Sequence, residues 1–332
     1  MAEKLANEDV PQRADPYRRE LLAHCYRMLG SVHDAEDLVQ ETYLRAWKAY
    51  DRFEGRSSLR TWLHSIATRA CLTALESRSK RPLPTGLGAP SGDPHESVLG
   101  TEQKEVPWLE PMPDNLLEGA DPSDVVASRQ TIRLAFIAAL QHLPPKQRAV
   151  LILRDVLKWK AAEVAELLDT TTASVNSALQ RAHAAIDKIA PSEDSVTEPT
   201  DAEQRALLDR WTAAFEAKDI DAIVQLFAKD AVWEMPPFPG WYEGPEAIGV
   251  LIDTQCPAGH GDMRVVPSAA NGQLAVGLYL RSKGETGDFL PWQYHVIEQG
   301  PDGVTHCAAF FGKQAFESAG LPEFVPADEP RR

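Results

Sequence analysis

Apolar residues return every three or four positions in the first part of the chain, from about residue 34 to residue 50. This spacing predicts an amphipathic helix, and Ser31, three residues before Asp34, is a suitable N-cap. A loop that starts at Phe53 and a second helix with a basic end at 78–81 follow. We expect the apolar stripe of the first helix to face a core, Trp47 included. The stripe consists of Ala35, Leu38, Val39, Thr42, Ala46, Trp47 and Tyr50.

A second helical stretch occupies the middle of the chain. The prolines at 144–145 stand where a helix can begin, and residues 159–168 form a short amphipathic helix. A turn at 169–171 leads into a helix over 172–186, with Thr171 as its expected N-cap. Two helices joined by so short a turn are typical of a helix-turn-helix, whose second helix enters the major groove of DNA.

The last part of the chain changes from helical to strand-like periodicity. Residues 205–228 predict two helices and residues 245–252 a third. Helices followed by a meander predict an α+β fold, in which a curved sheet wraps around helices and leaves a pocket at its mouth. The strand-like runs are 263–267, 273–281, 289–298 and 304–311.

Charge divides the 332 residues sharply. Residues 1–81 carry a net charge of +2 and residues 129–190 one of +4, whereas residues 82–128 carry −8 and residues 191–332 carry −13. The total of −15 therefore does not exclude DNA binding, because phosphates respond to nearby charges and those beyond about 10 Å are screened.

Residues 82–128 have the composition of a linker, rich in proline, glycine and acids. A few apolar residues interrupt it. They could dock onto a partner, but we favour local packing against a neighbouring helix. These residues are Trp108, Leu109, Met112, Leu116 and Leu117.

Cysteine usage and the N-terminus indicate a cytoplasmic protein. The four cysteines lie far apart without a CxxC pair, which argues against a zinc module and is typical of reduced thiols. The N-terminus is too polar for a signal peptide, and no apolar run approaches the length of a membrane span. We expect no metal, no cofactor and no membrane contact.

In sequence order, the helix over 34–47, the motif Phe53-Glu-Gly-Arg-Ser-Ser and the helix after it resemble region 2 of the extracytoplasmic-function (ECF) sigma factors. These are the bacterial promoter-specificity subunits of RNA polymerase. The resemblance covers residues 14–82 and implies a helical bundle that docks on core polymerase and captures an unstacked base of the minus-ten element. For the aromatic residues, core packing is an equally good explanation. The implied polymerase contacts are Asp37, Gln40 and Glu41, and the implied minus-ten contacts are Phe53, Ser57, Ser58, Arg60, Trp62, Arg69 and Thr73.

The helix-turn-helix, within residues 127–190, resembles sigma region 4, which reads the minus-thirty-five element. The turn often carries glycine where this chain has Asp169, a residue that tolerates left-handed geometry. The family often places basic residues where Asn176 and Ala178 lie, so this helix should hold DNA poorly without polymerase. Asn and Gln can bond bidentately to adenine, and Arg to guanine. The implied contacts are Thr172, Ser174, Asn176, Ser177, Gln180 and Arg181.

Residues 201–322 resemble the SnoaL-like (ketosteroid-isomerase-type) fold. The resemblance rests on Met235-Pro-Pro237 before Trp241-Tyr-Glu-Gly244, and on Asn271-Gly272 before a strand. This fold hosts enzymes and ligand binders, so the fold alone does not decide activity. Our pocket candidates are aromatic, although core packing explains most of them equally well. They are Trp233, Trp241, Tyr279, Trp292 and Phe310.

The catalytic acid of such isomerases is missing from the expected place. Those enzymes use a carboxylate base in an apolar pocket, and Met235 stands where that acid would be. Glu234 would point to the other side of a strand. Isolated histidines such as His295 and His306 are more often packed or solvated than catalytic. We therefore do not expect an enzyme.

Together these observations predict a multidomain sigma factor that binds core RNA polymerase and promoter DNA. Two all-α domains at 14–82 and 127–190 precede an α+β SnoaL-like domain at 201–322, with linkers at 83–126 and 191–200. The last domain is expected to regulate the sigma module by contact, and a small hydrophobic ligand could bias that contact. The alternative is a bifunctional protein whose last domain is an isomerase- or cyclase-like enzyme. A repressor that binds DNA unaided is disfavoured by the region 2 signature.

Overall fold

The computed structural model describes residues 13–77, 80–91, 93–95, 102–117, 130–188, 200–281 and 285–329. The chain divides into two compact units. The first, here the helical unit, combines Met1–Arg81 with Leu116–Pro191. The second, here the cone unit, combines Pro82–Asn115 with Ser192–Arg332. Most of the acidic segment that separates the two helical domains in the sequence therefore belongs to the cone unit.

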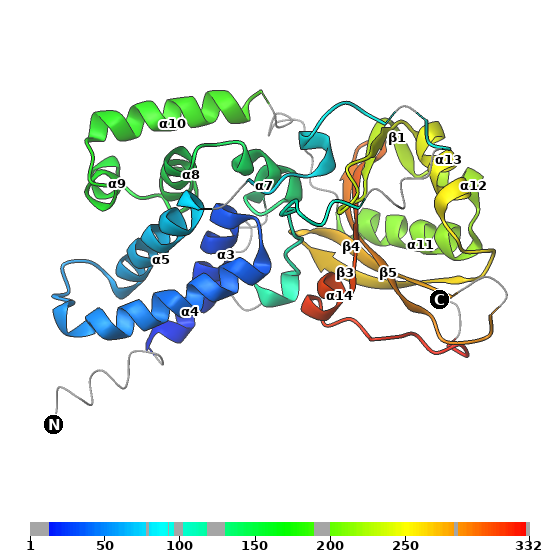
Figure 1. Ribbon diagram of the computed structural model, residues 1–332, viewed down its shortest axis with the longest axis horizontal. Helices are drawn as coiled ribbons and strands as arrows, with labels where there is room; N and C mark the ends of the chain where they lie inside the picture. The colour runs from blue at the N-terminus through cyan, green and yellow to red at the C-terminus, as the bar shows by residue number, and fades with distance from the viewer. Residues whose placement is uncertain are drawn as a thin grey trace. The chain divides into compact units, whose positions relative to one another are not determined.

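Three helices of the helical unit pack side by side, coloured blue in Figure 1. α4 begins as predicted, because the Ser31 hydroxyl accepts a hydrogen bond from the backbone N–H of Asp34 at 3.1 Å. Gly30 ends the preceding helix with a φ of 70°, which favours glycine. The carboxylate of Asp34 pairs with Arg81 at 2.6 Å, whereas Arg78 of the basic run lies outside the described residues. The helices are α3 (Arg18–Leu29), α4 (Val32–Ala49) and α5 (Leu59–Glu76).

The prediction that Trp47 is a core residue was wrong. α4 buries Ala35, Val39 and Ala46 in the bundle, but the Trp47 residue is 47% exposed. One step along a helix turns the side chain by about 100°, so Trp47 lies beside the stripe that contains Ala46. The buried stripe is narrower than the apolar pattern.

The second half of the helical unit contains the predicted helix-turn-helix. α8 starts at Pro145 as expected, and α9 and α10 are joined by a turn in which Asp169 adopts the left-handed conformation with a φ of 50°. Thr171 caps α10 by accepting a hydrogen bond from the N–H of Ser174 at 3.1 Å. The helices are α7 (Leu134–Gln141), α8 (Pro145–Leu151), α9 (Ala161–Leu167) and α10 (Thr172–Ile186).

A buried arginine joins the two halves of the helical unit. Arg148 of α8 is 2% exposed and donates to the carbonyl oxygens of Met28, Gln141 and Leu143. It also donates to Oε1 of Gln141 at 2.7 Å. Burial lowers the pKa of Arg148 to about 10, so the guanidinium stays charged at neutral pH. These acceptors offset the cost of removing its charge from water.

The cone unit forms the predicted α+β fold, with one six-stranded sheet and its covering helices (Figure 1). The strand order is β2-β1-β6-β5-β4-β3, and β1 with β6 is the parallel pair. Of the linker predicted at 191–200, Thr200 is described, and it caps the first helix. The helices are α11 (Asp201–Ala217), α12 (Ile220–Val224), α13 (Pro245–Gln255) and α14 (Lys313–Ser318). The strands are β1 (Phe227–Glu234), β2 (Trp241–Glu243), β3 (Met263–Ala270), β4 (Gln273–Leu280), β5 (Leu290–Gly300) and β6 (Gly303–Phe311).

An aromatic core fills the space between α11 and one face of the sheet. Trp211 stacks on Phe215 with ring centroids 4.7 Å apart, and Trp233 of β1 lies nearly parallel to Trp211 at 6.5 Å. The other face of the sheet is covered by α14, where Phe316 contacts the ring of Tyr279 at 5.2 Å. Because side chains alternate along a strand, each strand supplies one set of residues to the core and the other set to the opposite face.

Glu234 points away from this core, as predicted, and is fully buried. Its Oε1 lies 2.6 Å from Nε2 of His306, and its Oε2 accepts the backbone N–H of Thr85 at 2.9 Å. Burial alone would lower the pKa of His306, but the carboxylates of Glu234 and then Glu298 outweigh burial and raise it. The imidazolium is therefore favoured beside Glu234.

No helix among the described residues is both long and apolar enough to cross a membrane.

We expect the cone unit to lose stability as the pH rises through the raised pKa of His306. A group whose pKa is raised on folding stabilises the fold fully below its unfolded pKa, about 6.5, and loses this contribution as the pH rises through the folded pKa. The melting temperature of the full chain should therefore fall from pH 6 towards higher pH, and it should fall less for His306→Gln. The same slope in both proteins would contradict this assignment.

Candidate functional site

The three candidate polymerase contacts lie on the accessible side of α4. Asp37 and Gln40 are exposed, and Glu41 is partly exposed. The Nε of Arg45 donates to Oε1 of Glu41 at 2.7 Å. The acidic face expected from the sequence is therefore present on the helix.

Two apolar side chains extend this face of α4. Leu44 is 52% exposed and Trp47 is 47% exposed. They follow Gln40 at intervals of four and three residues, so they lie along one side of the helix. Large exposed apolar residues beside charged ones are typical of protein interfaces. Neither residue was predicted at an interface: the helical pattern placed Trp47 in the core, and Leu44 lies outside the apolar stripe.

The loop implied to capture a base has an aromatic wall. The rings of Phe53 and Trp62 lie 4.7 Å apart, and Tyr50 lies 6.1 Å from Phe53. Both Phe53 and Trp62 are only partly buried, so their rings remain accessible for stacking. Ser57 is exposed, whereas the hydroxyl of Ser58 caps α5 by accepting the N–H of Thr61 at 3.1 Å.

Two of the candidate contacts on α5 already have hydrogen-bond partners within the helical unit. Arg60 donates through Nε to Oε2 of Glu20 at 2.5 Å. Arg69 donates to the carbonyl oxygen of Leu167 of α9 at 3.5 Å, within the same unit. Thr73 is exposed. These bonds orient the two guanidinium groups, whose other N–H groups can still donate to DNA.

The candidate minus-thirty-five contacts share the accessible surface of α10. Val175 and Ala182 are buried, which directs the other side of the helix to solvent. Arg181 donates to the hydroxyl of Ser177 at 2.6 Å, so this pair is already oriented along the helix. The exposed positions are Thr172, Ser174, Asn176, Ser177, Gln180 and Arg181.

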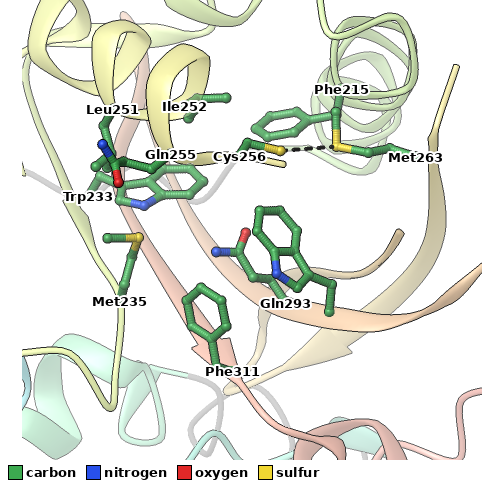
Figure 2. A pocket seen from close by; sticks show the side chains of 11 residues that line it. Phe215, Trp233, Met235, Leu251, Ile252, Gln255, Cys256, Met263, Gln293 and Phe311 are labelled. Carbon is green, nitrogen blue, oxygen red and sulfur yellow. Dashed lines mark hydrogen bonds between the residues drawn. The ribbon is translucent and has the colours of Figure 1, made fainter. Parts of the chain in front are cut away.

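An apolar pocket opens between α13 and the inner face of the sheet in the cone unit (Figure 2). Trp233 and Trp292 line it, as predicted. Its free space, counted out to the solvent at its mouth, is about 410 Å³. The lining residues are Phe215, Trp233, Met235, Leu251, Ile252, Gln255, Cys256, Met263, Trp292, Gln293 and Phe311.

Three of the pocket candidates do not line this pocket. Phe310 and Tyr279 lie on the opposite face of the sheet, because alternation gives the pocket Phe311 instead. The hydroxyl of Tyr279 donates to the carbonyl oxygen of Pro322 at 2.7 Å. Trp241 lies on β2, where its indole N–H donates to Gly88 of the linker at 3.0 Å.

The pocket lacks the groups that proton-transfer chemistry needs. Among the described residues that line it, none is Asp, Glu, His, Lys or Arg. Met235 lines the pocket, whereas the carboxylate of its neighbour Glu234 does not. His295 lies behind the lining, and burial lowers its pKa to about 3, so it is neutral. Burial raises the pKa of the Cys256 thiol, which disfavours a thiolate nucleophile.

Within the cone unit, the sheet and loops after residue 200 bind the segment that the sequence predicts as a linker. Beside the Thr85–Glu234 bond, Ser91 donates through its N–H to the carbonyl oxygen of Trp241 at 2.8 Å. Gln103 donates to the carbonyl oxygen of Pro237 at 3.0 Å. These bonds attach the first half of the linker to β1, β2 and the loop between them.

The end of the linker is attached to the β3–β4 turn. Asn271 and Gly272 form this turn with φ of 57° and 66°, as expected for a hairpin. The Asn271 side chain accepts the N–H of Met112 at 2.9 Å, and the Asn271 N–H donates back to Met112 at 2.8 Å. Asp114 accepts the N–H of Gly272 at 2.9 Å. For Met112, we expected packing against a neighbouring helix, but it lies on this turn.

The four cysteines are buried and free. Among the described residues, no group of three or more His, Cys, Asp or Glu side chains is placed to hold a metal ion.

Three families match the chain in the order of its domains. Residues 14–81 match Sigma-70 region 2, residues 133–186 match Sigma-70, region 4, and residues 208–304 match the SnoaL-like domain. The chain is 57% identical over 318 residues to the ECF RNA polymerase sigma factor SigG of Mycobacterium tuberculosis, which covers 95% of this chain and 84% of that protein. The chain belongs to the ECF RNA polymerase sigma factors.

A second relative of this sigma factor has a known crystal structure. SigJ of Mycobacterium tuberculosis is 30% identical over 216 residues, which cover 65% of this chain and 61% of SigJ. The crystal structure of SigJ matches with a TM-score of 0.60 and 23% identity, over 94% of this chain and 99% of that one. At this identity, the likeness shows a shared fold along nearly the whole chain.

We expect Asn271→Gly to loosen the end of the linker without unfolding the turn. Glycine keeps the positive φ, but the acceptor for the Met112 N–H is lost. Hydrogen exchange of the peptide around Met112 should become several-fold faster, while Asn271→Asp, which retains a side-chain oxygen, should exchange like the wild type. Unchanged exchange in Asn271→Gly would show that this bond does not hold the linker.

Proposed function

We propose that this sigma factor binds core RNA polymerase through α4 and directs it to promoters through the loop at Phe53–Trp62 and through α10. The exposed acidic and apolar face of α4, the accessible aromatic wall and the exposed polar positions of α10 support this proposal. Polymerase and promoter DNA are its proposed partners, and the cytoplasm is its proposed location.

We further propose that the cone unit regulates initiation by holding the linker, and that it is not an enzyme. The observation that carries this proposal is the set of hydrogen bonds from Thr85, Ser91, Gln103 and Met112 to the cone unit. The two ends of this linker are covalently joined to regions 2 and 4. Whatever holds the linker therefore restrains both promoter-binding regions.

Chain length indicates why this restraint matters. The names of the two promoter elements set them about 25 base pairs apart, or about 85 Å along B-DNA. A free chain from residue 82 to α7, which begins at Leu134, could extend up to about 175 Å. With Asp114 held on Gly272, the chain from there to α7 extends only up to about 65 Å. Release of the linker therefore widens the separations that regions 2 and 4 can reach.

The pocket chemistry disfavours the bifunctional alternative. An isomerase or cyclase needs a positioned acid or base, and the described lining residues supply none. A regulatory role needs only that the cone unit bind the linker, which the hydrogen bonds support.

We expect Trp47→Ala to weaken binding to core polymerase by tenfold or more. An aromatic residue at the centre of an interface commonly contributes about 2 kcal/mol or more. Binding of the full-length protein to purified core enzyme measures the effect. Leu87→Ala is the matched control, because Leu87 is also 47% exposed but lies in the linker. If both variants bind like the wild type, α4 does not dock as proposed.

Charge reversal at Asp37 and Glu41 should also weaken core binding, and the loss should shrink at high salt because these side chains are exposed. The fold should be unaffected, since neither residue is in the core.

We expect Asn176→Ala and Arg181→Ala to reduce initiation in a way that depends on the minus-thirty-five sequence. A lost bidentate base contact costs about 1–3 kcal/mol in discrimination. Transcription from a panel of upstream sequences measures it. A loss that is equal for all sequences would instead indicate phosphate contacts or damage to folding.

Residues 1–190 alone should give several-fold more transcript than the whole chain in a reconstituted assay with core polymerase. Asn271→Gly should shift output in the same direction by a smaller amount, and Asn271→Asp should match the wild type. Equal output from the truncated and full-length proteins, across promoters and salt conditions, would refute the regulatory role.

A further inference from the structure

The pocket of the cone unit contains an unsatisfied hydrogen-bond donor. Trp233 is 1% exposed, and its indole N–H has no hydrogen-bond partner among the described residues. In Figure 2 its nitrogen lies on the side of the ring that faces the cavity, near Met235. A buried N–H without an acceptor is costly, by about 1–3 kcal/mol, so an acceptor from outside the chain would stabilise this site.

Gln293 adds a second donor. Nε2 of His295 lies 3.0 Å from Oε1 of Gln293. Because burial keeps His295 neutral, its Nε2–H can donate to this oxygen, which leaves the amide N–H₂ group of Gln293 for the pocket. Figure 2 shows this nitrogen turned towards Trp233 and Met235. The indole N–H of Trp233 and the amide group of Gln293 can therefore both donate to a molecule in the pocket.

The remaining lining limits what can bind. The walls are aromatic, aliphatic and thioether side chains, and no charged group among the described lining residues could balance an ionised ligand. The Cys256 thiol lies 4.0 Å from the Met263 sulfur. The space of about 410 Å³ includes open solvent at its mouth, so the enclosed part admits only a small molecule.

We infer that this pocket binds a small, neutral, apolar molecule with a carbonyl-type oxygen, which accepts hydrogen bonds from Trp233 and Gln293. The molecule is bound and not converted, because the described lining residues include no acid or base to act on it.

Residues that line the pocket or stand beside it also bind the linker, so a bound ligand can affect the linker. Gln255 lines the pocket, and its side-chain amide donates to the carbonyl oxygen of His95 at 3.2 Å. Glu234, which holds Thr85, stands on β1 between the lining residues Trp233 and Met235. A ligand that shifts β1 or the end of α13 therefore acts on linker attachments. This step rests on the proposed regulatory function, whereas ligand binding itself does not.

Three probes of nearly equal shape test the chemistry on the full-length protein. Acetophenone carries the ketone, α-methylstyrene replaces its oxygen with a CH₂ group, and benzoate carries a negative charge. Ligand-observed NMR titration should show acetophenone binding about tenfold more tightly than α-methylstyrene, and benzoate not binding. Equal affinity of acetophenone and α-methylstyrene, or binding of none of the three, would overturn the inference.

Two matched variants locate the site. Trp233→Phe keeps an aromatic ring but removes the indole N–H, and it should weaken acetophenone binding about tenfold with little effect on α-methylstyrene. Trp211→Phe is the control, because Trp211 is buried in the same core with an equally unpartnered N–H but does not line the pocket. Equal losses in both variants would mean that the core, and not the donor, sets affinity.

Hydrogen exchange of residues 82–91 with and without acetophenone tests the coupling, and the rate should change when the probe is bound. If the probe binds but the exchange rate of residues 82–91 is unchanged, the pocket binds a ligand but ligand binding does not affect the linker. If transcription by residues 1–190 equals that of the whole chain while the probe still binds, the regulatory function fails and the ligand site stands.

Discussion

Backbone hydrogen bonding between the linker and the cone unit is the constraint on which this organisation depends. The regular structure in the described parts of the linker is limited to short 3₁₀ turns at Pro84–Gly86 and Asp114–Leu116 and a single bridge between Pro113 and Ala270. Its N–H groups therefore need partners outside the segment, and the cone unit supplies acceptors to Thr85, Ser91 and Gln103. The segment that joins the two promoter-binding regions thus takes its conformation from a domain that follows both of them in sequence.

Strand alternation then gives β1 two functions. Trp233 and Met235 face the pocket, while Glu234 between them faces the linker and pairs with His306. The carboxylate of Glu234 could serve as a base if it faced the pocket. On the outer face it binds the backbone N–H of Thr85 in the linker. The same two-residue period that places Met235, and not Glu234, in the pocket creates the attachment of the linker.

The two proposed interfaces of the helical unit both lie on helices that bury few large side chains. α4 presents its acids and two apolar side chains to solvent because its buried stripe is made of small residues such as Ala35 and Ala46. α10 keeps two small residues, Val175 and Ala182, inside and leaves its polar positions exposed. Because the buried stripe is narrow in both α4 and α10, most of each helix surface is exposed and available to the proposed partners.

The sequence by itself determined the order of the domains and the local structure that depends on neighbouring residues. The caps at Ser31 and Thr171, the left-handed Asp169 and the Asn271-Gly272 turn follow from side chains that bond to their own backbone or tolerate a positive φ. Alternation also predicted that Glu234 and Met235 point in opposite directions.

Only the tertiary structure decided which residues meet across the chain. Periodicity could not distinguish a core Trp47 from an exposed one, because the width of a buried stripe depends on the helices packed against it. The one-residue choice between Phe310 and Phe311 required the register of β6 in the sheet. The apolar residues of the linker indicated that it could dock, but they did not show where, since most of its hydrogen bonds are made by backbone groups, which find their partners only in the folded chain.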